Sequence, residues 1–169
     1  MDQRQKLRNI SEQSLYFFTR EIMDYKAVHA PLHEEIVCPF LTDWEGDKFI
    51  KLLLIPREHL KSTIASISFP NWLWSIQHPE KKNFPCGPET RILLSHGKRE
   101  LACTYVRETK NHHTSNDVFR YVCDDIVFDE PHKQAPLWRE DQIVVRREGG
   151  PGWGVLYLFL VPPLPVTKI

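Results

Sequence analysis

The apolar positions in the first part of the chain recur at three- and four-residue steps. This spacing predicts an amphipathic helix whose buried face carries Leu15, Phe18, Ile22 and Tyr25. Asn9, with Glu12 three residues later, predicts the start of that helix, because the two side chains can cap free backbone N–H groups. A second helix is predicted from Pro31, since proline suits the first turn of a helix.

Three short apolar runs further along the chain predict β-strands at 49–55, 91–95 and 142–146. The run 49–55 is nearly continuous, as is typical of a strand buried on both faces of a parallel sheet. Helical patterns from Lys61, at 98–110 and at 117–123 separate the three runs. This alternation predicts an α/β fold, in which a parallel sheet is flanked by helices.

Length and composition favour one compact globular domain. The chain has 169 residues, of which 41% are apolar and 26% are charged. Its 22 basic and 22 acidic residues give a formal charge of zero, which excludes a grossly basic nucleic-acid coat but not a local basic patch. Four cysteines without a C-x-x-C pair argue against a disulfide scaffold and favour a reduced, cytoplasmic protein. The longest apolar run, 153–161, is too short for a membrane helix.

The most informative stretch is 52–63, which has the layout of a phosphate-binding P-loop. A buried strand, a short loop and Lys61-Ser62-Thr63 lead into a helix. In such a loop the lysine reaches phosphate oxygens and the following hydroxyl ligates Mg²⁺. However, Ile55 and Leu60 occupy both glycine positions of the strict motif. The alternative interpretation is an ordinary helix that happens to begin with these three residues.

Four segments together resemble the ATPase region of a known family. They are 16–25 with Leu32-His33, 55–63, 92–102, and 138–147. The second segment resembles a variant P-loop that begins with Pro-Arg and has leucine at the second glycine position. In order and spacing, the four segments resemble the N-terminal ATPase region of tailed-bacteriophage terminase large subunits, the motors that package DNA.

The resemblance implies ATP and Mg²⁺ as cofactors and assigns a role to each matching residue. Arg57 would be catalytic, by neutralising charge on the transferring phosphate. Residues Glu58, His59, Leu60, Lys61, Ser62 and Thr63 would form the nucleotide-binding loop, with Ser62 on Mg²⁺, and His33 would lie near the adenine. In the complete protein, the implied partners are double-stranded DNA, the small terminase subunit and the portal. The implied setting is the host cell cytoplasm, with the gene carried by a phage or prophage.

The resemblance ends before the second acidic strand that a P-loop motor requires. In this family an apolar run ending in acids should follow the strand at 142–146, yet no Asp or Glu occurs after Glu148. The acidic stretch 124–130, with Asp129 and Glu130, is an alternative source of the acid, but it precedes that strand. We therefore divide the chain into a partial, incomplete P-loop ATPase domain, 1–148, and a non-matching apolar tail rich in Pro and Gly, 149–169.

Two functions follow, and the sequence leaves the choice between them open. One is the ATP-binding part of a DNA-packaging motor that couples ATP hydrolysis to DNA translocation. The other is a truncated, non-catalytic remnant that binds a nucleotide or a partner without turnover.

Two further groups of side chains contain residue types that bind metals. They are His29, His33 and Cys38, and His112, His113 and Cys123. Neither group has the paired short spacings of a structural zinc site. Surface histidines and core cysteines are the interpretation that the sequence favours.

Overall fold

The structure is a computed structural model, and it describes residues 2–43, 50–146 and 155–160. The chain begins with helix α1 (Gln3–Gln13) and breaks at Ser14. Helix α2 (Leu15–Phe17) follows and widens into a π-helical segment, Phe18–Ile22. The predicted helix start at Asn9 is therefore wrong. The hydroxyl of Ser14, which accepts the Phe17 N–H over 3.1 Å, caps the helix that buries Leu15, Phe18 and Ile22.

The second predicted helix is confirmed and has two parts. A π-helical segment, Ala30–Val37, carries Pro31 in its first turn. It continues as α3 (Cys38–Thr42). His33 and Val37 are buried on its inner side.

The helix that follows the candidate P-loop is also confirmed. Helical backbone begins at Lys61. It runs through a π-helical segment, Thr63–Ser68, into α4 (Phe69–Ser75). Trp72 and Trp74 of α4 are buried in the core. A 3₁₀ turn, Pro79–Lys81, then leads toward the first strand.

The remaining helices are α5 (Arg99–Ser115), α6 (Asp117–Val122) and α7 (Pro131–Gln134). The first two correspond to the predicted helices at 98–110 and 117–123. Two apolar side chains on these helices lie at the surface: Leu101 is 44% and Val118 is 46% exposed. The opposite faces of these two helices supply Val106, Phe119 and Val122 to the core.

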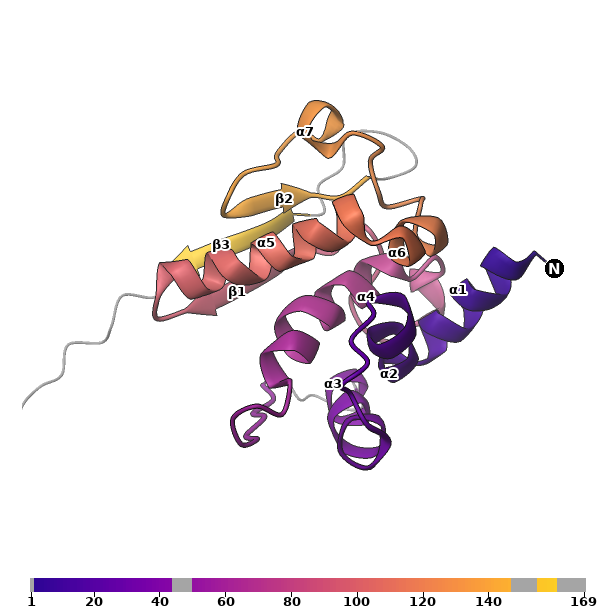
Figure 1. The fold of residues 1–169 in the computed structure, drawn as a ribbon, viewed down its shortest axis with the longest axis vertical. Coiled ribbons are helices and arrows are strands. Elements are labelled where there is room, and N and C mark those ends of the chain that lie inside the picture. The colour runs from indigo at the N-terminus through magenta and orange to yellow at the C-terminus, as the bar shows by residue number, and fades with distance from the viewer. Residues whose placement is uncertain (1, 44–49, 147–154, 161–169) are drawn as a thin grey trace, which may run out of the picture.

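Three strands form a small mixed sheet with the order β1-β3-β2. Strand β1 (Ile92–His96) is parallel to β3 (Val155–Leu160), and β2 (Gln142–Val144) is antiparallel to β3. Helix α5 lies along this sheet, and helices α1 to α4 form the other part of the molecule (Figure 1). Strands β1 and β2 confirm two of the three predicted strands. The middle strand comes from the stretch that the sequence set apart as a tail, of which 149–154 and 161–169 lie outside the described residues.

The predicted strand at 49–55 is wrong within the described residues 50–55. These residues are extended but pair with no strand in the described part of the chain. Their side chains alternate: Ile50, Leu52 and Leu54 are 90%, 74% and 80% exposed, whereas Leu53 and Ile55 pack against the core. The core therefore covers only one face of this segment. The sequence does not reveal this, because its apolar residues are nearly continuous. Phe49 lies outside the described residues.

The chain thus contains both helices and strands, as the coarse fold class predicted, and helix predominates among the described residues. Its parallel component among the described residues is the pair β1 and β3, and the segment before the candidate P-loop takes no part in the sheet. Across the described ranges, no helix has the length and apolar character needed to cross a membrane.

Candidate functional site

The loop between the extended segment 50–55 and the following helix surrounds a cavity of about 380 Å³. Residues 56–63 line it, and these include every residue from Arg57 to Thr63 that the sequence assigned to nucleotide binding. Because Lys61, Ser62 and Thr63 form the first turn of the helix, they bring its free backbone N–H groups to the cavity. Helix starts of this kind favour anions, through both the N–H groups and the helix dipole.

The backbone of the loop is left-handed at two residues that are not glycine. Glu58 has φ 69° and Leu60 has φ 51°. Leu60 occupies the second glycine position of the P-loop motif, so its conformation is the one for which that motif uses glycine. Leucine at this position therefore has the left-handed backbone that glycine adopts most readily.

Lys61 points back across the loop. Its Nζ donates to the carbonyl oxygen of Ile55 over 3.4 Å, which is a long hydrogen bond. The loop thus folds around the lysine side chain. The helix itself starts with the Ile64 N–H donating to the Leu60 carbonyl over 2.9 Å.

His33 reaches the same loop from the π-helical segment Ala30–Val37. Its Nε2 lies 3.2 Å from the carbonyl oxygen of His59. His33 is 1% exposed and does not line the cavity, so it contacts the loop without being part of the cavity wall. Within the loop, Nδ1 of His59 lies 2.8 Å from the Arg57 carbonyl oxygen. The structure therefore brings together every residue that the sequence named, with His33 outside the cavity wall.

The acidic stretch that was an alternative source of a catalytic acid lies elsewhere. Glu130 pairs with Lys133 of α7 at 2.6 Å. Helix α7 lies at the opposite end of the molecule from the loop 56–63 (Figure 1). Among the described residues that line the loop cavity, Glu58 is the sole acid. In the part of the chain that the structure describes, no group of three or more His, Cys, Asp or Glu side chains could hold a metal ion.

The histidines of the two histidine and cysteine groups are not all at the surface. His33, His112 and His113 are buried, which corrects the expectation of surface histidines. Burial lowers the pKa of His113 to about 3 and raises the pKa of Cys123 to about 12. Such groups are uncharged near neutral pH.

One polar network was missed by the sequence reasoning. Tyr25 Oη lies 3.2 Å from a carboxylate oxygen of Glu108 and 2.9 Å from Nε2 of His112. Asn116 extends this network, because its Nδ2 lies 3.0 Å from Nδ1 of His112. Glu108 and His112 are four residues apart, a spacing that puts them on one face of α5, and this was the available signal; Asn116 follows the last residue of that helix. The network borders an open cavity of about 560 Å³.

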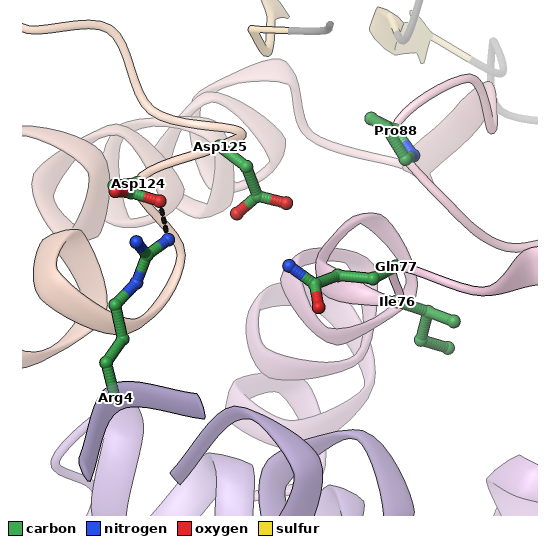
Figure 2. Close-up of a pocket in the computed structure, with 6 residues that line it drawn as sticks. All are labelled: Arg4, Ile76, Gln77, Pro88, Asp124 and Asp125. Atoms are coloured by element: carbon green, nitrogen blue, oxygen red, sulfur yellow. Dashed lines mark ion pairs between the residues drawn. The ribbon is translucent and has the colours of Figure 1, made fainter. Parts of the chain in front are cut away.

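A third cavity, of about 390 Å³, lies beside α1 and the turn that follows α6. Figure 2 shows its six lining residues, with Arg4 paired to Asp124 across it. The carboxylate of Asp125 accepts hydrogen bonds from Arg8. The charged groups there are thus already paired with one another, so the loop 56–63 remains the stronger candidate site.

The chain was compared with models of protein families, with curated protein sequences and with solved structures, and none of them matched.

Proposed function

We propose that this chain binds the phosphates of ATP, with Mg²⁺, through the loop 56–63. The observation that carries the proposal is the conformation of Leu60. A left-handed residue directly before Lys61 and a helix start, around an open cavity, is the arrangement that a P-loop motif encodes with glycine.

In this proposal four loop residues have a defined task. Lys61 exchanges its long hydrogen bond to the Ile55 carbonyl for a phosphate oxygen, which as an anion is the stronger acceptor. Ser62 supplies a hydroxyl ligand to Mg²⁺, with Thr63 beside it on phosphate oxygens. Arg57, exposed at the cavity, neutralises charge on the transferring phosphate.

The wider proposal is that the chain is the ATP-binding part of a phage terminase large subunit. The complete protein would couple ATP hydrolysis to the movement of double-stranded DNA, together with a small terminase subunit and a portal. The support is the resemblance of the four segments and the loop geometry. The parallel sheet flanked by helices that such an ATPase has is part of this wider proposal, without the segment 50–55, which pairs with no strand in the described part of the chain.

The second candidate function is a module that binds nucleotide without hydrolysing it. The observation that favours it is that Glu58 is the sole acid among the described residues lining the cavity. A P-loop motor needs a further carboxylate to anchor Mg²⁺ and to orient the attacking water.

Titration with ATP–Mg²⁺ tests the proposal. The Lys61→Ala variant loses a charged hydrogen-bond donor worth about 1.5–3 kcal/mol, so its affinity should fall about 10- to 100-fold. Lys6→Ala is the matched control, because Lys6 is an exposed lysine on α1 that lines none of the cavities described above. Equal affinity in the wild type and in Lys61→Ala would refute the phosphate role.

A further inference from the structure

We propose that His33 is a positioning residue of the phosphate loop, acting through the main chain of His59. This inference rests on the proposed function and changes the role that the resemblance implied, which was a contact with adenine. The side chain is 1% exposed and lies outside the cavity wall, whereas His59 is part of that wall. A group in this position acts on a bound nucleotide only through the loop.

The hydrogen bond between His33 and the His59 carbonyl oxygen requires a proton on Nε2 of His33, because a carbonyl oxygen can only accept. On the other side of the ring, Nδ1 lies 3.0 Å from the backbone nitrogen of His29, whose N–H donates to it, and 3.2 Å from the His29 carbonyl oxygen. The Nε2 N–H donates to the His59 carbonyl oxygen over 3.2 Å. The other tautomer would place two lone pairs against each other at this contact.

The contact matters because it sets the orientation of one peptide group in the loop. In a trans peptide the C=O of His59 and the N–H of Leu60 point in opposite directions. No cis peptide bond occurs in the described residues. Holding the His59 carbonyl toward His33 therefore aims the N–H of Leu60, a residue that lines the cavity, away from His33.

The position of this peptide makes it a control point for anion binding. It lies between the two left-handed residues Glu58 and Leu60. Rotation of the peptide would turn a carbonyl oxygen toward the phosphate in place of an N–H group. A loop that binds anions with its backbone requires successive N–H groups to face the ligand. His33 therefore stabilises the peptide orientation that accepts phosphate.

Two polar substitutions separate the two hydrogen bonds of His33. His33→Gln places an amide N–H near the Nε2 position and can still donate to the His59 carbonyl. His33→Asn has a shorter side chain that can accept from the His29 N–H but does not reach His59. Circular dichroism and thermal melting establish that both variants are folded before ligands are added.

The ligands are ATP and inorganic tripolyphosphate, each with Mg²⁺, because tripolyphosphate has no base. We expect His33→Asn to weaken both by the same factor, about 2- to 10-fold, which is the loss of one ordinary hydrogen bond. His33→Gln should bind both within about twofold of the wild type, a difference of under about 0.5 kcal/mol. A loss confined to ATP would show that His33 contacts the base, and would overturn the inference. Equal binding by the Asn variant, or equal loss in both variants, would also overturn it.

A second measurement keeps this inference separate from the proposed function. If the wild type binds neither ligand, the proposed function fails, but the loop can still be examined in the free protein. Amide hydrogen exchange of 57–62 should be faster in His33→Asn than in the wild type, and restored in His33→Gln. Identical exchange in all three proteins would show that His33 does not hold the loop.

Discussion

Arg8 and Asp125 are 117 positions apart in sequence and form a bidentate ion pair in which the Arg8 side chain is buried and the Asp125 side chain is 23% exposed. Nη1 and Nη2 of Arg8 each lie 2.9 Å from one carboxylate oxygen of Asp125. The other donors of the guanidinium reach Glu12 and the carbonyl oxygens of Ser75 and Val122. These carbonyls belong to the last residues of α4 and α6, so one buried cation joins α1 to two helix C-termini.

The first prediction concerns this buried charge. Arg8→Met should lower the free energy of unfolding by about 3–5 kcal/mol, because it leaves Asp125 and two helix ends without their buried partner. Arg4→Met is the control: Arg4 pairs with Asp124 at the surface, where such pairs contribute about 0–1 kcal/mol. Urea denaturation measures both variants. Similar losses in the two variants would contradict the special role of Arg8.

The second prediction is a pH dependence of stability that originates in His113. This residue is buried, its Nε2 lies 2.9 Å from the side-chain oxygen of Asn71, and burial lowers its pKa to about 3. In the unfolded chain an ordinary histidine titrates near pH 6.5. Between these two values the unfolded state binds a proton that the folded state excludes. Stability is therefore complete above about pH 6.5 and declines as the pH falls, by up to about 1.4 kcal/mol per pH unit.

Urea denaturation at a series of pH values from 7 to 4 tests this prediction. His113→Gln keeps a donor for Asn71 but cannot take up the proton, so its stability should fall less steeply with acid than that of the wild type. Identical slopes for the two proteins would show that another group controls the acid response.

The elements were predictable where local pattern alone decides them. Helix α5 and the helix after Lys61 follow from apolar spacing, and β1 from a short apolar run. The segment 50–55 shows the limit of such patterns. Its apolar run is equally consistent with a strand covered on two faces and with an extended segment covered on one, and only its neighbours in space decide between the two.

The candidate site was predictable in part for a similar reason. Residues 57–63 are contiguous, so any fold keeps them together. The contact between His33 and the His59 carbonyl spans 26 positions and involves a main-chain atom, which no side-chain pattern records. The pair of Arg8 and Asp125 is equally invisible, because each residue by itself is typical of a solvated surface.

The third prediction concerns the backbone at Leu60. A left-handed conformation costs a residue with a Cβ atom roughly 1–2 kcal/mol, and glycine avoids this cost. Leu60→Ala is the matched control, because it removes the same half-buried side chain yet keeps the Cβ. Leu60→Gly should be about 0.5–1 kcal/mol more stable than Leu60→Ala, since the flexibility of glycine offsets part of the gain. It should also bind ATP at least as tightly as the wild type. A glycine variant less stable than the alanine variant would argue against the left-handed backbone.

The last prediction is that the isolated chain hydrolyses ATP negligibly, even where it binds it. Hydrolysis needs a carboxylate to anchor Mg²⁺ and another to orient the attacking water, and proton transfer by such a group typically contributes about 10²–10⁴-fold. Of the described residues lining the loop cavity, Glu58 is the one acid, and Glu130 is paired with Lys133 at the other end of the molecule.

A steady-state assay of phosphate release on the pure protein, with Lys61→Ala as the control for contaminating ATPases, measures the rate. Robust release that is lost in Lys61→Ala and in Glu130→Gln would overturn the prediction, because it would require Glu130 to reach the loop. Release that is lost in Glu58→Gln instead would make the loop its own source of the catalytic acid.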